Sequence, residues 1–326
     1  MSAQRVAPML AVAGDPPAGS SYWHEPKFDG YRVGVVVEDG QARLVSRGDR
    51  SLTAAFPTLA AAATAAAAGR SMVLDGEVVA VGAGGRPDFE ALQARARRRG
   101  HGTGGPALRL VLFDLLHLDG HDLLDAPLWR RRELLEGLGL DQTPGVGLSP
   151  VFRDVDPAVL LRAVGDHALE GVVTKRVTST YQPGRRSRAW VKTVIRHHTY
   201  VVIGGWHQGR ARRAGAVGAL LVGVPDPDGG GLRYVGSVET GWTRAEHAEL
   251  AALLHDRVRP ACPFAQPAAS LPRAAVWVEP ELTGRVAYRE WTSTGMLRHP
   301  SWKGLHRHGS GTVGGASAPG HHHGEE

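Results

Sequence analysis

Lysine is nearly absent from this basic sequence of 326 residues. Only four of its 38 Lys and Arg residues are lysines, at positions 27, 175, 192 and 303. An arginine guanidinium stays protonated and is a poor nucleophile, whereas a lysine amine can lose its proton when burial or neighbouring cations lower its pKa. The few positions that keep an amine, Lys27 first among them, are therefore the candidates for covalent chemistry.

Cysteine and long apolar runs are scarce as well. Cys262 is the only cysteine, which excludes an intrachain disulfide and a zinc module built on several cysteines. No run approaches the roughly 20 apolar residues that a membrane-spanning helix needs, and residues 1–14 lack the basic start and apolar core of a secretion signal. We therefore expect a cytoplasmic protein with no membrane contact. Its net charge of +6 favours a polyanionic partner.

The segment around Lys27 reads E-P-K-F-D-G-Y-R (residues 25–32) and precedes an alternating apolar run at residues 33–37. This pattern predicts a tight turn that carries Lys27 just before a strand, with Glu25 and Asp29 beside it and Arg32 close by. An ordinary surface lysine in a turn would give the same pattern, so the segment alone leaves both interpretations open.

Three further segments combine a buried-strand pattern with charged residues. L-D-G-E-V-V (74–79) carries Glu77, E-G-V-V-T-K-R (170–176) carries Glu170 and Lys175, and W-V-K (190–192) ends on Lys192. A nucleophilic amine, two carboxylates on separate strands and two further cations are what transfer of a nucleotide from a triphosphate requires. The carboxylates can hold Mg2+ (or Mn2+), and the cations neutralise charge on the phosphate oxygens.

In this order, these segments resemble the nucleotidyltransferase motifs of ATP-dependent DNA ligases. The series also contains S-R-G-D-R (46–50) and L-F-D-L-L-H-L-D-G (112–120), and R-E-W-T-S-T-G-M-L-R-H-P-S-W-K-G-L (289–305) is similar to the last ligase motif. The resemblance is strongest to bacterial ligases related to the ligase domain of multifunctional end-joining enzymes, and it covers nearly the whole chain. One such motif is a weak signal, but the ordered series is specific.

The resemblance implies an α+β fold in two domains. Residues 1–196 would form a nucleotidyltransferase (adenylation) domain with an ATP-grasp-like mixed sheet, residues 197–308 an OB-fold β-barrel, and residues 309–326 a disordered tail. Hydrophobic patterning predicts strands at 31–37, 42–46, 72–81, 108–115, 171–177 and 189–195, then at 200–206, 216–224, 232–238, 275–279 and 285–291. Helices are predicted at 57–68, 89–99 and 244–258, the last with a capping box formed by Thr243 and Glu246.

The resemblance also implies a three-step reaction on ATP and on nicked or broken duplex DNA. Lys27 would attack the α-phosphate of ATP, release pyrophosphate and keep AMP on its amine. AMP would then pass to the 5′-phosphate of the break, and the adjacent 3′-hydroxyl would displace it. Asp29 would orient the amine or accept its proton, and Lys175 and Lys192 would hold the α-phosphate.

Further roles follow from the same resemblance. Glu77 and Glu170 would hold the metal ion. Phe113 would stack on the adenine ring, although its strand pattern alone favours a core residue. The other nucleotide-binding candidates are Glu25 at the adenine 6-amino group, Arg32 and Arg47 at ribose or phosphate oxygens, and Arg298 and Lys303 at pyrophosphate.

The sequence departs from the family pattern at three positions. Two residues after Lys192, where related ligases commonly have a second lysine, this chain has Val194. Side chains alternate along a strand, so positions 192, 194 and 196 share a face, and we expect Arg196 to bring the missing charge to the nucleotide. In the last motif, Thr294 replaces a frequent acidic residue and His306 replaces a frequent arginine.

Two other functions stay open. The chain could be a different lysine nucleotidyltransferase, such as an RNA ligase or an RNA-capping enzyme, which uses the same first-step residues on another acceptor or nucleotide. It could also be a DNA-end binding protein whose catalysis is weakened by the three departures. For a ligase, we expect a monomer that works in end joining, with bacterial Ku and a separate repair polymerase as partners, or in excision repair.

Overall fold

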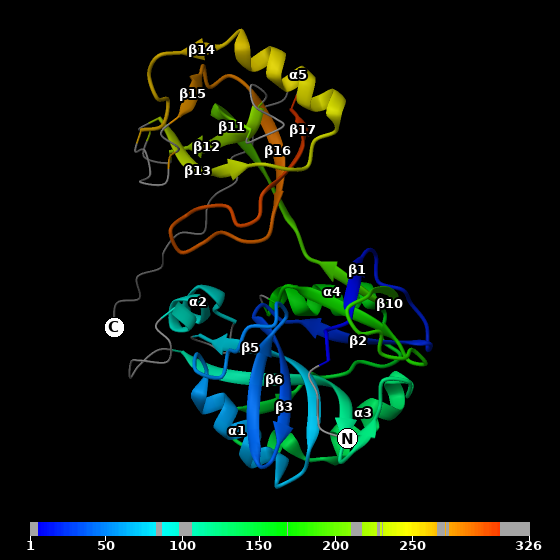
Figure 1. Cartoon of the computed structure of the whole chain (residues 1–326). Helices are drawn as coiled ribbons and strands as arrows, with labels where there is room; N and C mark the ends of the chain where they lie inside the picture. Colours follow the sequence, from blue (N-terminus) through cyan, green and yellow to red (C-terminus); the bar gives the residue numbers. More distant parts are fainter. Residues whose placement is uncertain are drawn as a thin grey trace, which may run out of the picture. The chain divides into compact units, whose positions relative to one another are not determined.

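The computed structural model describes residues 6–82, 87–97, 106–167, 169–209, 217–226, 229, 231–265, 271 and 274–306. The chain divides into two compact units, Met1–Ile195 and Arg196–Glu326, each described here by itself (Figure 1). The tail expected at 309–326 and the end of the helix expected at 89–99 lie outside the described residues. None of the described helices is long and apolar enough to cross a membrane.

Two sheets form the first unit. The larger has the order β4-β3-β5-β6-β7, with β8 parallel to β6, and the smaller has the order β1-β10-β9-β2, with β1 parallel to β10. The larger sheet consists of β3 (Tyr31–Glu38), β4 (Gln41–Ser46), β5 (Met72–Val81), β6 (Ala107–Leu118), β7 (His121–Asp122) and β8 (Val146–Leu148). The smaller consists of β1 (Leu10–Ala13), β2 (Tyr22–Lys27), β9 (Gly171–Arg176) and β10 (Arg186–Val194). Parallel and antiparallel pairs thus occur in both sheets.

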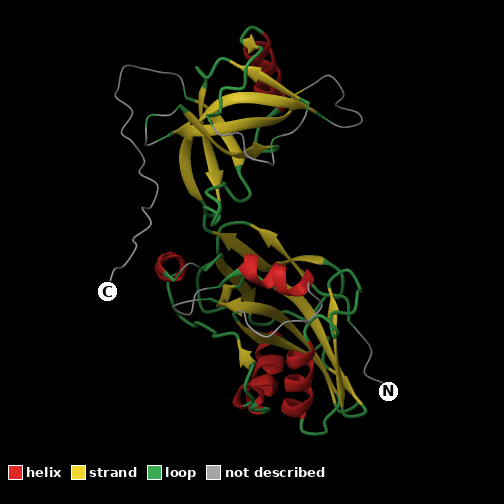
Figure 2. Ribbon diagram, turned by 90° about the vertical axis from the view of Figure 1, so that its left-hand side faces the viewer, coloured by secondary structure: helices red, strands yellow, loops and turns green. Residues whose placement is uncertain are grey.

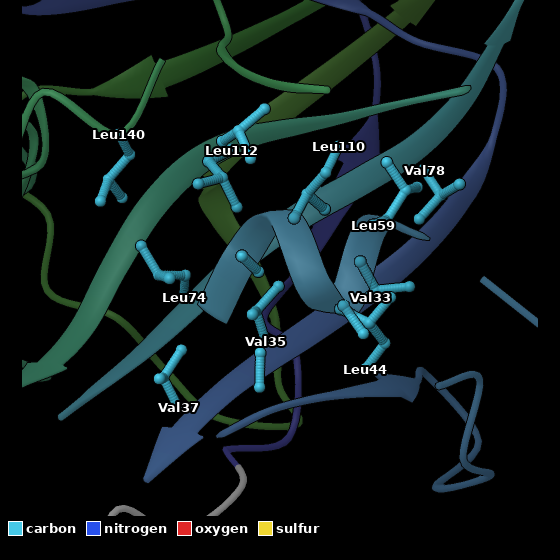
Figure 3. Close-up of a cluster of buried hydrophobic side chains, with 14 of the residues drawn as sticks. Val33, Val35, Val37, Leu44, Leu59, Leu74, Val78, Leu110, Leu112 and Leu140 are labelled. Atoms are coloured by element: carbon cyan, nitrogen blue, oxygen red, sulfur yellow. The ribbon is translucent and has the colours of Figure 1, made fainter. Parts of the chain in front are cut away.

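Helices cover the outer faces of these sheets. They are α1 (Pro57–Ala67), α2 (Phe89–Arg97), α3 (Leu128–Gly137) and α4 (Pro157–Asp166), with a short 3-10 helix at Leu140–Gln142. On one face of the larger sheet, Val33, Val35 and Leu74 pack with Leu59 of α1 in the main core, as Figure 3 shows. On the outer face of the smaller sheet, Val172 packs with residues of α4.

A second apolar cluster joins the two sheets. Val36 of β3 and Val73 of β5 alternate with the residues that face α1, and they pack with Met9, Tyr181 and Trp190 of the smaller-sheet region. Because strand side chains alternate between faces, the same face of the larger sheet also carries the polar residues at positions 32, 75 and 77. The polar groups of the motifs therefore face the smaller sheet.

A fully buried ion pair fixes α3 to β6. The side chains of Arg131 and Asp114 are both 0% exposed. The Arg131 guanidinium donates from Nε and Nη2 to the two oxygens of the Asp114 carboxylate, at 2.7 and 2.9 Å. Its Nη1 donates to the carbonyl oxygens of Ala126 and Ser179. The pair therefore has the additional hydrogen bonds that a desolvated ion pair requires.

Arg131→Met should destabilise the first unit by about 3 to 5 kcal/mol, because it leaves the Asp114 carboxylate buried without a partner. The neighbouring Arg130 pairs with Glu133 at half-exposed positions, so Arg130→Met should cost less than about 1 kcal/mol. Urea unfolding of the full chain measures both variants. Equal urea midpoints for the two variants would contradict this role of the Arg131–Asp114 pair.

The second unit is an antiparallel barrel with one described helix, as the ribbon in Figure 2 illustrates. Its strands run in the order β13-β12-β11-β15-β14, and β16 pairs with both β11 and β17. Its elements are β11 (His197–Gln208), β12 (Val217–Pro225), β13 (Leu232–Val238), α5 (Arg244–His255), β14 (Val258–Arg259), β15 (Ala275–Val278), β16 (Thr283–Tyr288) and β17 (Ser301–Leu305). The helix follows the third strand and begins with the capping box of Thr243 and Glu246, both as expected.

Several local expectations need correction. Lys27 is the last residue of β2, so a strand precedes it as well as follows it. Helices α3 and α4 and strand β1 were not expected, and α5 ends at His255 because β14 begins at Val258. At the start of α2, the Asp88 carboxylate accepts a hydrogen bond from the Ala91 amide at 2.9 Å.

Candidate active site

An open pocket of about 580 Å3 lies in the first unit and is lined by residues from both sheets. This volume is in the range of small-molecule sites, which is roughly 300–1,000 Å3. Eight residues expected at the site line it, namely Glu25, Lys27, Arg32, Arg47, Glu77, Phe113, Lys175 and Lys192. The sequence therefore identified residues that the fold brings together from six separate segments.

The turn after β2 carries the chain from the smaller sheet to the larger one and positions Lys27. Gly30 lies so close to β5 that a Cβ atom at this position would approach the Val78 carbonyl oxygen to 2.1 Å and the Glu77 side chain to 2.8 Å. Any other residue would push the turn away from β5. The glycine of the K-x-D-G segment thus brings Lys27 next to the larger sheet.

Glu170 holds the amine of Lys27. The Lys27 Nζ donates to Glu170 Oε2, and the two side chains are 22% and 12% exposed. The Glu170 amide also donates to the Lys27 carbonyl oxygen at 3.2 Å, and the Glu170 carbonyl oxygen accepts from Ile195 at 3.0 Å. Backbone and side chain together fix the carboxylate beside the amine.

Strand register places the site residues of the smaller sheet in three rows on one face. Trp23, Lys175 and Trp190 form the first row, and Lys27, Gly171 and Val194 form the last. The row between them joins Glu25, Val173 and Lys192. Successive rows are two residues apart, or about 7 Å along the strands. Lys175 and Lys27 therefore belong to opposite ends of the site.

The Lys175 end is buried and aromatic. Its Nζ lies 2.7 Å from Glu25 Oε1, and the exposures of the two side chains are 2% and 5%. The same Nζ lies 4.6 Å from the centre of the Phe113 ring and 4.5 Å from that of Trp190. Apart from this contact with Glu25, the Lys175 Nζ has no polar partner within the described residues, and the Trp190 Nε1 has none there. This end offers polar donors and ring faces to a flat, polar ligand.

A carboxylate and a phenol hold Arg32 in the pocket wall. The Arg32 guanidinium donates to both Asp75 oxygens, from Nε at 3.0 Å and from Nη2 at 2.6 Å. The Tyr181 hydroxyl donates to Asp75 Oδ2 at 2.6 Å and accepts from the Met9 amide at 2.9 Å. Burial, reinforced by the charge of Asp75, raises the pKa of Tyr181. Tyr181 therefore remains a neutral donor to this carboxylate.

Burial raises the pKa of the Glu77 carboxyl to about 8. The positive charges of Lys27 and Arg32 oppose this rise, and the carboxylates of Asp75 and Glu170 add to it. No group of three or more His, Cys, Asp or Glu residues that could hold a metal ion by itself occurs in the described part of the chain. Glu77 and Glu170 nevertheless form a pair of nearby carboxylates, and Mg2+ is commonly held by one or two carboxylates together with substrate phosphates.

Glu77 should make the protein less stable as the pH rises. Its folded-state pKa lies above the ordinary value of 4.5, so between these two values the folded state binds the proton more tightly than the unfolded state, and stability falls as the pH increases. We expect the urea midpoint of wild type to fall, relative to Glu77→Gln, between about pH 5 and about pH 8, without nucleotide or metal. Parallel pH profiles of the two proteins would contradict this.

Several expected residues do not line the pocket. Asp29, in the turn after β2, and Glu170, which contacts Lys27, both lie outside the lining. Strand β10 ends at Val194, so the alternation from Lys192 does not extend to Arg196, whose Nη1 donates to the His299 carbonyl oxygen within the second unit at 3.4 Å. The nucleotide-binding role of Arg196 stays a prediction.

Two more expected residues belong to the second unit. Arg298 pairs with Glu290, from Nη1 to Oε1 at 2.5 Å, and Lys303 is an exposed residue of β17. Thr294 and His306 are also exposed. The pocket of the first unit contains none of these side chains.

Sequence analysis missed Arg186, Trp190 and the Asp75–Tyr181 contact. Trp190 lies two residues before Lys192 and Asp75 two residues before Glu77, so alternation along each strand was an available signal. Arg186 also lies an even number of residues before Lys192, but alternation alone does not place it, because the register with β1 shifts between the pairs Ala11–Ser187 and Val12–Val191.

Comparisons with known proteins agree with this geometry. The family model "ATP dependent DNA ligase domain" matches residues 8–193, and "ATP dependent DNA ligase C terminal region" matches residues 213–308. A multifunctional non-homologous end joining protein LigD from Mycolicibacterium smegmatis is 40% identical over 309 residues, which are 92% of this chain and 38% of that protein. A DNA ligase from Methanothrix thermoacetophila is 35% identical over 72% of this chain and 43% of that protein.

A solved structure shows the same two-part fold. The crystal structure of the ligase domain from M. tuberculosis LigD is 37% identical, with a TM-score of 0.55, and the match covers 92% of this chain and 95% of that one. A mycobacterial DNA ligase D complexed with ATP and MES is 38% identical, with a TM-score of 0.56. The expected α+β adenylation fold followed by an OB-fold is thereby confirmed. The chain spans less than half the length of the curated relatives named above.

Proposed function

The chain belongs to the ATP-dependent DNA ligase family, and we propose that its first unit transfers AMP from ATP through Lys27 to a 5′-phosphate at a DNA break. The observation that carries this proposal is the Lys27–Glu170 pair at the edge of a pocket that combines cations, carboxylates and buried aromatic rings. The same pocket supports the use of ATP, which is a property of the family.

We assign the adenine to the buried end of the pocket and the phosphates to the Lys27 end. Glu25 would accept a hydrogen bond from the adenine 6-amino group, and Lys175 would donate to a ring nitrogen. The ring would lie against Phe113. The support for this orientation is the burial of the Glu25–Lys175 pair and the position of Lys175 two rows from Lys27. Lys175 thus serves the base, rather than the α-phosphate as the motif pattern suggested.

At the Lys27 end of the pocket, the charged side chains determine the chemistry. The Lys27 amine attacks the α-phosphorus, a P–N bond forms, and the P–O bond to the β-phosphate breaks with release of pyrophosphate. Glu170 aims the amine and is close enough to receive its proton, a role for which Asp29 is the alternative. Lys192 and Arg47 neutralise charge that develops on the phosphate oxygens. Positioning and electrostatic stabilisation account for most of such a transfer.

A magnesium or manganese ion fits this end of the pocket. Burial raises the pKa of the Glu77 carboxyl, and a divalent cation beside Glu77 and Glu170 would stabilise its charged form. When bound, the ion would withdraw electrons from the phosphate oxygens. The protein's own contribution is to hold both carboxylates in place through β5 and the Lys27–Glu170 backbone contact.

The second unit and the cellular role complete the proposal. Arg298 and Lys303 would orient pyrophosphate in the first step, for which Arg298 must exchange its partner Glu290.

Relatedness to end-joining proteins supports a role in DNA double-strand break repair, with bacterial Ku and a repair polymerase as partners. The match is to the ligase part of those proteins only, so excision repair is the second candidate pathway.

The choice of nucleotide and acceptor tests this function. The protein should form a labelled adduct with ATP but not with GTP, and it should seal nicked duplex DNA faster than nicked duplex RNA. An adduct formed from GTP would indicate a capping enzyme. Sealing of RNA alone would indicate an RNA ligase, and no adduct with either nucleotide would favour a DNA-end binding protein.

A further inference from the structure

Positive charges gather around Lys192, which belongs to the middle row of the site. Burial lowers the pKa of Lys192, and the charges of Lys27, Arg186 and Arg47 lower it further. All four side chains line the pocket. The carboxylate of Glu170 opposes this lowering of the Lys192 pKa. The four cations outnumber it, and like charges repel one another, so a further anion among them would be favourable.

Three of the cations that line the pocket have a carboxylate partner. Lys27 pairs with Glu170, Arg32 with Asp75, and Lys175 with Glu25. Arg186 differs: across the described ranges it has no carboxylate partner, and its Nη1 donates to the carbonyl oxygen of Ala11 at 2.5 Å. This contact engages one of five N–H donors. The others are available to a ligand.

The position of Arg186 is fixed by an irregular strand pair. Arg186 begins β10 opposite Leu10 of β1, and Leu10 and Ala11 also line the pocket. The register of β10 against β1 shifts after Ser187, and Arg186 before the shift and Lys192 after it both line the pocket. Farther along β10, Val194 presents an apolar side chain in the row of Lys27.

We propose that Arg186 binds the triphosphate of ATP and stabilises the transfer of AMP to Lys27. Its guanidinium would donate to phosphate oxygens beside Lys192, where negative charge grows as the bond to pyrophosphate breaks. Arg186 forms no covalent bond and transfers no proton. It would supply a positive charge that Val194 does not. The proposal rests on the proposed function and adds a residue to its first step.

Formation of the AMP adduct without DNA tests the proposal. In single-turnover measurements over a range of ATP concentrations, Arg186→Ala should lower the maximal rate by about 10²-fold, the size of effect expected for one lost donor at a developing charge. Arg188→Ala is the matched control, because Arg188 is an exposed arginine of the same strand that does not line the pocket. It should react at the wild-type rate.

Variants that restore a positive charge show whether Arg186 acts through its charge or through a structural role. Arg186→Lys should keep part of the rate, and adding Val194→Lys to Arg186→Ala should recover part of it. Arg186→Ala should also weaken binding of a non-hydrolysable ATP analogue while leaving binding of adenosine unchanged. A wild-type rate in Arg186→Ala would overturn the inference, as would a loss that neither lysine recovers or that Arg188→Ala shares. A wild-type protein that forms no adduct would instead refute the proposed function itself.

Discussion

Lys27→Arg should abolish the covalent AMP adduct. The substitution keeps the positive charge and the approximate length of the side chain, but the guanidinium stays protonated and cannot attack phosphorus. Because the chain has only four lysines, digestion of the labelled wild-type protein and mass spectrometry of its peptides can assign the AMP to one lysine. The expected result is AMP on the peptide that contains Lys27 and on no other.

Two controls accompany this substitution. Lys27→Arg should unfold at the wild-type urea midpoint, since Lys27 is partly exposed and arginine can still pair with Glu170. It should also retain binding of ATP, because the adenine end of the pocket is unchanged. A folded Lys27→Arg protein that still becomes labelled by ATP would exclude Lys27 as the nucleophile.

Glu170→Ala should slow adduct formation by about 10²- to 10³-fold, which corresponds to about 3 to 4 kcal/mol of transition-state stabilisation. The loss is large because this carboxylate both aims the Lys27 amine and is a candidate to hold the metal ion. Glu170→Asp keeps the charge at a shorter reach and should retain more activity. The measurement is the single-turnover rate of labelling by ATP at several Mg2+ concentrations.

Glu133→Ala is the matched control for Glu170→Ala. Glu133 is an exposed carboxylate that also pairs with a basic residue, Arg130, but it lies on α3 outside the pocket. Its removal should leave the labelling rate unchanged. If Glu170→Ala, Glu170→Asp and wild type label equally fast, Glu170 has no part in the reaction.

Much of the site could be predicted because the motifs are local. Lys27 and Gly30 lie in one short segment, and the close approach of Gly30 to β5 makes that spacing necessary. Glu77 and Glu170 lie in strand patterns that are evident from apolar alternation alone. Such features depend on neighbours in sequence, which a single sequence displays.

The remaining features depend on contacts between distant segments. The position of Lys175 beside Glu25 follows from the register of β2 against β9, which the sequence does not specify. The buried pair of Arg131 and Asp114 requires α3, a helix whose polar composition gave no clear amphipathic pattern. Arg186 and Lys192 line the same pocket although the register of β10 against β1 shifts between them. These arrangements depend on tertiary packing, which can override the structural preference of a local sequence pattern.

The most direct test of the account is a chase of the isolated adduct. Wild-type protein is labelled with ATP, freed of nucleotide and mixed with nicked duplex DNA and Mg2+. We predict that label leaves Lys27, appears briefly as AMP on the 5′-phosphate of the nick and is released as that nick is sealed, with no further ATP. An adduct that keeps its label in the presence of nicked DNA, or that transfers it without sealing, would contradict the account.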